Sequence, residues 1–229
     1  MIRLFSPKYY QPICRFLYHR LPPFTFGLFL FLCYWILFSV PQDINQGLAF
    51  KWIYVHVPCA FASMALYLVM ALCSILKWVY HIKVAGWISS ITAKIGCLAT
   101  ALAISSGSIW GYYTWGVMWV WDPRLTTELM MLMLYLAFIL ADQAAVMNRS
   151  SYKLPMVIGV IGVFNLPLIH YSVVWWQSLH QGSTLLNLSN QTMPWDMLWP
   201  LMLSILTAAC AIVSIVAARI LHNTKPSCR

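Results

Sequence analysis

The sequence predicts an all-α integral membrane protein with six transmembrane helices. Of its 229 residues, 62% are hydrophobic and only 8% are charged, and the mean hydropathy is +0.75. Soluble domains are about 45–50% apolar and about 25% charged. Six long apolar segments and a one-sided distribution of Lys and Arg support the same fold class. We expect one transmembrane domain over residues 1–229, without an internal repeat or a soluble domain.

The six segments are long enough to span a bilayer, because a spanning helix needs about 20 mostly apolar residues. They cover residues 24–40, 55–76, 88–109, 128–147, 154–175 and 197–221. The third contains Lys94, whose long side chain can reach the nearer interface. The residues after the first segment, Ser39-Val40-Pro41-Gln42, do not resemble a signal-peptide cleavage site. We therefore expect the first segment to remain as a span.

The basic residues lie almost entirely on one side of this topology. One side carries twelve of the 14 Lys and Arg residues, namely Arg3, Lys8, Arg15, Arg20, Lys77, Lys83, Lys94, Arg149, Lys153, Arg219, Lys225 and Arg229. The other side carries only Lys51 and Arg124. Because basic loops stay in the cytoplasm, both termini are predicted to be cytoplasmic and the loops near 41–54, 110–127 and 176–196 to face outward.

Tryptophan is distributed in the opposite way. Nine lie on the predicted outer side, namely Trp52, Trp110, Trp115, Trp119, Trp121, Trp175, Trp176, Trp195 and Trp199, against Trp78 and Trp87 inside and Trp35 within the first span. The outer loop over 110–127 opens with four Trp and two Tyr in residues 110–122. This flat apolar surface would suit a planar ligand such as haem or a quinone ring, although interfacial Trp also anchors membrane proteins without binding anything.

Three histidines lie toward the same outer side. His56 stands at the entry to the second span and His180 in the last outer loop, so two neutral imidazoles could bind a haem iron from opposite sides. Either one alone would more simply be an amphipathic interfacial residue. His170 is the rival to His180, but its depth in the fifth span favours a hydrogen bond to a neighbouring helix or a contact with the haem edge. His19, His81 and His222 are predicted to be solvated cytoplasmic residues.

Charged residues follow the last tryptophan of the loop. Arg124 could pair with a haem propionate, or Asp122 and Arg124 could instead contact each other or lipid headgroups. Thr126 or Thr127 is expected to cap the fourth helix, with Glu128 in its first turn. The seven cysteines never form Cys-x-x-Cys or Cys-x-x-Cys-His, so any haem would be held without covalent attachment.

These residues carry a family resemblance. The run Trp115-Gly116-Val117-Met118-Trp119-Val120-Trp121-Asp122-Pro123-Arg124-Leu125-Thr126 resembles the W-G-x-x-W-x-W-D-A-R-L-T signature of the WWD family, the haem-handling membrane proteins of cytochrome c maturation. Within it, the length, the six spans, Trp52 to Pro58 and the segment from Trp175 to Ser183 resemble haem exporter protein C over nearly the whole chain. Pro123 departs from the usual Ala and should stiffen the loop without removing a ligand.

The resemblance implies a site and a pathway. Haem b, bound transiently and without covalent attachment, would have His56 and His180 as axial ligands. The cofactor-binding set would be completed by Trp110, Trp115, Trp119, Trp121, Asp122 and Arg124. The protein would sit in the bacterial inner membrane with its site facing the periplasm, and would deliver haem to a periplasmic haem chaperone. Its other partners would be a small single-span subunit and an ABC transporter module.

Other function classes fit the residues less well. The chain lacks a G-x-x-x-x-G-K-[ST] phosphate loop, so we expect neither an ATPase nor another enzyme. A membrane b-type cytochrome or quinone oxidoreductase subunit remains the alternative, although such proteins usually bind haem through histidines within the spans. A solute transporter would need charges deep in the spans, and Lys94, Glu128 and Asp142 all lie near helix ends. The net charge of +9 does not indicate nucleic-acid binding, because the basic residues lie between apolar runs.

Overall fold

The computed structural model describes residues 5–176, 180 and 193–224, and this part of the chain is helical without a strand. The elements are α1 (Pro7–Phe38), the short 3₁₀ helix η2 (Leu48–Trp52), α2 (Ile53–Tyr80), α3 (Lys83–Trp115), α4 (Pro123–Met147), α5 (Lys153–Val163), α6 (Asn165–Trp175) and α7 (Trp195–Asn223). Within these residues, six helical segments are long and apolar enough to cross a membrane, with α5 and α6 counting as one. The predicted fold class and number of spans are confirmed.

Several helix ends differ from the predicted spans. α1 begins at Pro7, although the predicted span begins near residue 24. Hydropathy marks only the apolar part of a helix, and α1 also includes the more polar residues before it. α3 runs on to Trp115, so Trp110 and Trp115 lie on a helix and not in a loop. The fifth span is broken at Phe164, where Pro167 lacks the backbone N–H that would bond to the carbonyl of Val163.

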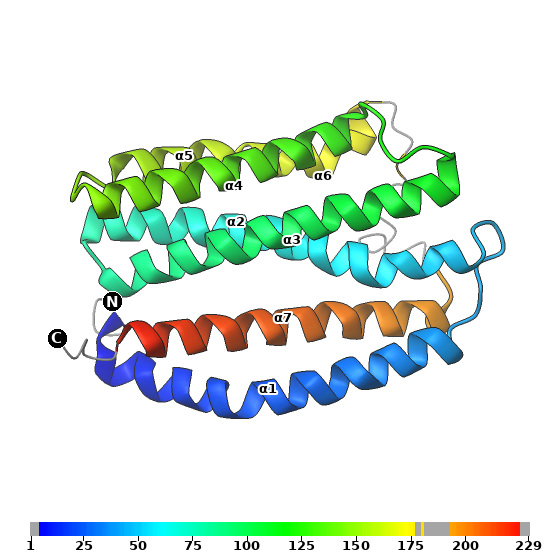
Figure 1. The fold of residues 1–229 in the computed structure, drawn as a ribbon, viewed down its shortest axis with the longest axis horizontal. Coiled ribbons are helices and arrows are strands. Elements are labelled where there is room, and N and C mark those ends of the chain that lie inside the picture. Colours follow the sequence, from blue (N-terminus) through cyan, green and yellow to red (C-terminus); the bar gives the residue numbers. More distant parts are fainter. Residues whose placement is uncertain (1–4, 177–179, 181–192, 225–229) are drawn as a thin grey trace.

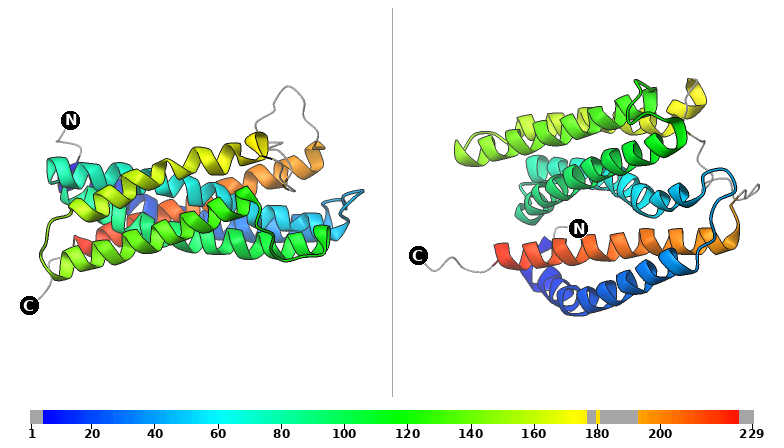
Figure 2. Two further views of the ribbon diagram at one scale, coloured as in Figure 1. Left: turned by 90° about the horizontal axis from the view of Figure 1, so that it is seen from above. Right: turned by 45° about the vertical axis from the view of Figure 1, so that its right-hand side comes forward.

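The helices are arranged in three layers (Figure 1). α4 packs with α5 and α6 on one side, α2 and α3 form the middle layer, and α7 and α1 form the third layer. The right-hand view of Figure 2 shows the same separation between the α1–α7 pair and the rest. The start of α1 and the end of α7 lie at one end of the bundle, and the α3–α4 connection lies at the other.

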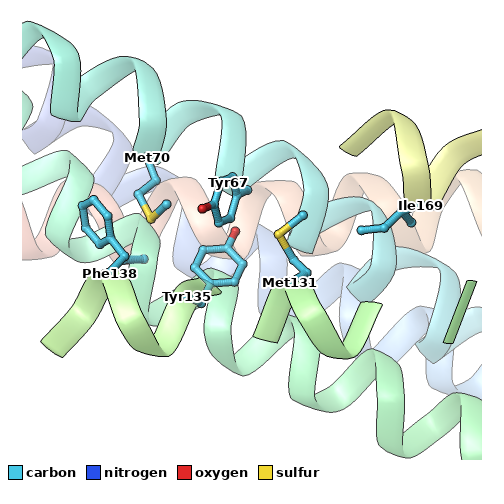
Figure 3. Close-up of a cluster of buried hydrophobic side chains, with 7 residues drawn as sticks. Tyr67, Met70, Met131, Tyr135, Phe138 and Ile169 are labelled. Carbon is cyan, nitrogen blue, oxygen red and sulfur yellow. The ribbon is translucent and has the colours of Figure 1, made fainter. Parts of the chain in front are cut away.

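Tyrosine and glycine residues connect the layer of α4, α5 and α6 to the layer of α2 and α3 (Figure 3). The Tyr135 hydroxyl donates to the Ser63 carbonyl (2.6 Å), and the Tyr67 hydroxyl donates to the Ile158 carbonyl (3.1 Å). A side chain on Gly96 or Gly162 would collide with these rings, so both glycines permit the close approach. Such contacts matter in a membrane, where lipid is as apolar as the side chains and burial alone does not drive helix association.

A charged cluster holds the opposite end of the bundle from the α3–α4 connection. Lys77 Nζ lies 3.8 Å from Asp142 Oδ1 and 3.3 Å from the centroid of the Tyr152 ring, and Ser90 Oγ donates to Asp142 Oδ2. This cluster contains an ion pair, a cation–π contact and a hydrogen bond. It joins α2, α3 and α4 to the start of α5, so its role is to fix helix packing.

Candidate functional site

His56 lies one turn into α2 and is held against α3. Its Nδ1 is 2.9 Å from the Ala103 carbonyl oxygen. Because a carbonyl only accepts hydrogen bonds, Nδ1 carries the proton and Nε2 keeps its lone pair. Gly107 makes room for the ring, since a Cβ there would lie 2.8 Å from His56 Cε1. Backbone contacts thus set both the position and the tautomer of this imidazole.

His180 lies outside the helices, in the segment between α6 and α7. The centroid of its ring is 6.4 Å from the centroid of the His56 ring. Burial lowers the pKa of His180 to about 4; the neighbouring Arg124 and His56 also lower it, and Asp122 acts against them. At neutral pH this imidazole is therefore uncharged and can offer a lone pair. The structure brings the two predicted iron ligands together.

A small cavity lies beside both histidines. It has a volume of about 40 Å³. Its walls come from α2, α3, α4 and α6, from the α3–α4 connection and from His180. They include His56, Met64, Gly107, Trp119, Arg124, Glu128 and Ile169. Typical ligand pockets are about 300–1,000 Å³, so a macrocycle bound here would extend beyond the cavity.

The four predicted tryptophans have different positions in the site. The Trp110 ring lies edge-on to His56 at 5.9 Å between centroids, and the Trp115 ring lies edge-on to His180 at 5.3 Å. Trp110 is fixed in turn, because its Nε1 donates to Gln46 Oε1 at 2.8 Å. Trp119 lines the cavity, whereas Trp121 packs edge-on against Trp119 and is 77% exposed. Trp110 and Trp115 therefore flank the imidazoles, and only Trp119 faces the cavity.

The loop that carries Trp119 and Trp121 is short and has defined ends. Gly116 ends α3 with φ of +76°, a left-handed conformation that glycine adopts without strain. Asp122 is buried and caps α4, accepting a 2.8 Å hydrogen bond from the Arg124 backbone N–H. Pro123 occupies the first turn, where its missing N–H costs nothing. The prediction that Thr126 or Thr127 caps this helix was wrong, because α4 starts at Pro123, one turn earlier, and Asp122 is its cap.

Two charged side chains of α4 face the cavity from successive turns. Arg124 and Glu128 both line it, and the Ser63 hydroxyl donates to Glu128 Oε1 at 2.8 Å. Sequence reasoning assigned Glu128 only to the start of a helix. Glu128 lies four residues after Arg124, and residues four apart share a helix face. This spacing could have indicated that Glu128 faces the same site as Arg124. Gly107 and Ala103 were missed because small residues carry no chemical signature.

His170 is placed away from these groups. It is partly buried on α6 and packs edge-on against Tyr171 at 4.8 Å between centroids. It is not among the residues that line the cavity. The three histidines predicted on the outer side therefore divide into a close pair, His56 and His180, and His170, which does not line the cavity.

The whole chain, apart from its last residues, resembles one protein family. The family model for Heme exporter protein C matches residues 1–225. This chain belongs to that family. Heme exporter protein C of Escherichia coli (strain K12) is 44% identical over 144 residues, which are 63% of this chain and 59% of that protein's length. The Haemophilus influenzae protein of the same name is 41% identical over 172 residues, 75% of this chain and 70% of its own length.

A mitochondrial relative extends the likeness beyond bacteria. A putative cytochrome c biosynthesis ccmC-like mitochondrial protein of Marchantia polymorpha is 35% identical over 162 residues, 71% of this chain and 67% of its own length. The matched segment spans under two thirds of the Escherichia coli relative. With six spanning helices and this family membership, the chain is a multi-pass membrane protein.

Proposed function

We propose that this member of the haem exporter protein C family binds haem at the outer face of the membrane and passes it on for cytochrome c maturation. The observation that carries the proposal is the close pair of imidazoles, His56 and His180, with ring centroids 6.4 Å apart. Imidazole nitrogens bind metals at about 2.0–2.1 Å, so two rings on one iron have centroids roughly 6 Å apart.

The donor set fits haem better than a free metal ion. Among the described residues, no group of three or more His, Cys, Asp or Glu side chains could hold a metal ion. Two axial imidazoles suffice when a porphyrin supplies the other iron ligands. When bound, haem would supply an iron that takes the lone pairs of His56 and His180. The Ala103 carbonyl supports this by fixing the His56 tautomer, as hydrogen-bonded partners of metal-binding histidines do.

Charge and aromatic surface support the rest of the assignment. Arg124 lines the cavity and would pair with a propionate, since guanidinium binds carboxylates in a fixed fork geometry. Trp119 would contact the ring, while Trp110 and Trp115 hold the imidazoles. The haem would be haem b, bound transiently without covalent attachment, because no Cys-x-x-Cys-His occurs in the sequence.

The proposal also includes the side of the membrane that the site faces and the proteins that work with it. The distribution of twelve basic residues on one side and two on the other supports a site that faces the periplasm from a bacterial inner membrane. The protein would hand haem to a periplasmic haem chaperone beside a single-span subunit and an ABC transporter module. It would catalyse no reaction itself, and any ATP hydrolysis would come from the transporter.

The test is haem retention in purified protein. The variants His56→Ala and His180→Ala should each lose the Soret absorbance of the wild type, measured per mole of protein in a monodisperse fraction. His170→Ala is the matched control, because this outer histidine does not line the cavity, and it should keep its haem. Full haem in both ligand variants would refute the axial assignment.

Delivery needs a second measurement. The wild type should co-purify with the chaperone in a haem-containing complex, and His180→Ala should lose that complex. Steady oxidation of a quinol by the haem-loaded wild type would instead support a permanent electron-transfer cofactor and contradict delivery.

A further inference from the structure

The third layer of the bundle contains a groove that the haem site does not use. It lies between α1, α7 and the outer half of α2, and has a volume of about 820 Å³. Its walls are almost wholly apolar and include Phe26, Phe29, Ile36, Val55, Ala211 and Ile215. This volume is within the range of sites for sizeable ligands.

The groove exists because α1 is held at its two ends and bowed between them. Near its start, Cys14 packs in a cluster with Val84 of α3 and Ala217 of α7. Near its end, Trp35 and Ile36 pack against a cluster that includes Leu201 of α7. Pro22 and Pro23 lie between these anchors, and proline bends a helix by removing a hydrogen bond and crowding the preceding turn. Figure 1 and the right-hand view of Figure 2 show α1 bowing away from α7 between its two ends.

A second cavity of about 480 Å³ continues the groove toward the start of α1. The two share Tyr18 and Ala218. The chemistry changes at this point, because the second cavity is lined by Gln11, Arg15, His19, His222 and Thr224. The combined site is apolar along the span, and its end near the start of α1 carries a guanidinium, two imidazoles and neutral hydrogen-bonding groups. Lys51 lines the other end of the groove, where its Nζ donates to the Leu37 carbonyl at 3.1 Å.

We propose that this combined site binds an anionic phospholipid, with its phosphate at Arg15, His19 and His222 and its acyl chains in the groove beside α7. Charge complementarity favours this occupant. Arg15 presents a guanidinium, which binds phosphate in a fork geometry, and an imidazole N–H can donate to a phosphate oxygen. Basic pockets between transmembrane helices on the cytoplasmic side are suited to anionic headgroups. The predicted topology places this end of α1 and α7 in the cytoplasm.

The apolar part sets the length of the ligand. The groove follows α1 from Tyr18 to Leu37 and α7 from Ser204 to Ala218. Small side chains of α7, including Thr207, Ala211 and Ser214, leave room along this wall. A free phosphate would use only the basic end, whereas a phospholipid would use both parts. The lipid would fill the space behind the bow in α1 and so link α1 to α7 at mid-length.

Native mass spectrometry of the full-length protein in mild detergent tests the proposal. Delipidated protein is titrated with phosphatidylglycerol or phosphatidylcholine of identical acyl chains, and sn-glycerol-1-phosphate is added as a headgroup without chains. One phosphatidylglycerol should bind at least about fivefold more tightly than phosphatidylcholine, the factor that one basic residue contributes near a charged lipid. Glycerol phosphate should not displace it at equal concentration.

Two pairs of variants locate the site. Arg15→Gln combined with His222→Gln should abolish the preference for phosphatidylglycerol, whereas Arg20→Gln should keep it because Arg20 is exposed on the same helix and lines neither cavity. Ala211→Leu should weaken the binding of both lipids, because the larger side chain fills part of the groove. Its control is Ala209→Leu, which changes an exposed position of α7 outside the groove.

Three results would overturn the proposal. Equal binding of the two lipids by the wild type would show that the basic end of the site does not select an anionic headgroup. Displacement by glycerol phosphate would show an anion site without acyl-chain binding. An unchanged lipid preference in the Arg15 and His222 double variant, whose exposed substitutions leave the helix packing intact, would place the lipid elsewhere. None of these results bears on haem binding at His56 and His180.

Discussion

The two histidines of the proposed haem site are held in different ways. His56 is on α2, its Nδ1 bonds to a backbone carbonyl of α3, and its ring lies against Gly107. His180 lies outside the helices, and its ring lies beside the rings of His56 and Trp115. One ligand is therefore part of the helix packing, and the other belongs to a connecting segment.

This difference suggests a division of labour in the proposed binding and release of haem. A ligand fixed by helix packing holds the iron in a constant position. A ligand on a connecting segment can leave the iron at lower cost, because its movement need not separate helices. We expect His180 to be exchanged for a partner's ligand during delivery while His56 stays bound.

Gly107→Val should have the largest effect. A Cβ at residue 107 would lie 2.8 Å from His56 Cε1 and 3.0 Å from Nδ1, so the imidazole must leave its place beside Ala103. We expect near-complete loss of the Soret band per mole of protein. Ser105→Leu is the control, because Ser105 is exposed on the same helix. Full haem content in Gly107→Val would mean that helix packing does not fix His56.

Arg124→Gln should weaken haem binding without changing the axial ligands. Hydrogen bonds to charged groups contribute about 1.5–3 kcal/mol, so we expect a roughly tenfold to hundredfold rise in the haem dissociation constant with an unchanged bis-histidine spectrum. Haem dimethyl ester, which has no propionate charge, provides the control ligand. The wild type and the variant should bind the ester equally. A variant defect of the same size with the ester would show that Arg124 does not pair with propionates.

The fold and the closeness of His56 and His180 could be predicted from the sequence, because each rests on a strong physical constraint. Spans follow from runs of apolar residues, and the joint outward position of His56 and His180 follows from counting spans and basic residues. The side of the membrane itself stays a prediction. The positions of the tryptophans were harder to predict, because the end of α3 depends on Gly116 and not on hydropathy.

The roles of Ala103, Gly107 and Glu128 could not be predicted for a different reason. Ala103 acts through its backbone carbonyl, and Gly107 acts through the absence of a side chain. Neither property is visible until α2 and α3 are placed side by side. The Glu128 carboxylate accepts a hydrogen bond from the Ser63 hydroxyl on α2, and the two residues are 65 positions apart in the sequence. Local patterns identify chemical groups but not the partners that long-range packing brings to them.

The pH dependence of His180 should be displaced from that of an ordinary histidine. Its pKa is lowered from 6.5 to about 4, so the folded ligand-free protein should keep this imidazole neutral down to about pH 4. The unfolded chain binds the proton near pH 6.5, so this group's contribution lowers the free energy of unfolding as pH falls from about 6.5 to 4. NMR of ¹³C-labelled histidine, with His180→Gln to assign the signal, measures the titration. A midpoint near 6.5 would show that His180 is not enclosed beside Arg124 and His56.

Trp121→Ala should have the smallest effect on haem affinity, and Trp119→Ala is its matched comparison. Both residues belong to the loop after α3, but Trp119 lines the cavity while Trp121 is 77% exposed and contacts Trp119 by its edge. We expect the haem dissociation constant to rise several-fold for Trp119→Ala and to stay within about twofold for Trp121→Ala, because surface substitutions away from packed sites usually change free energies by no more than about 0.5 kcal/mol. Equal losses would mean that the tryptophans of the loop act as one continuous platform. The expected inequality would instead separate a tryptophan that contacts the ring from one that faces outward, where a partner can reach it.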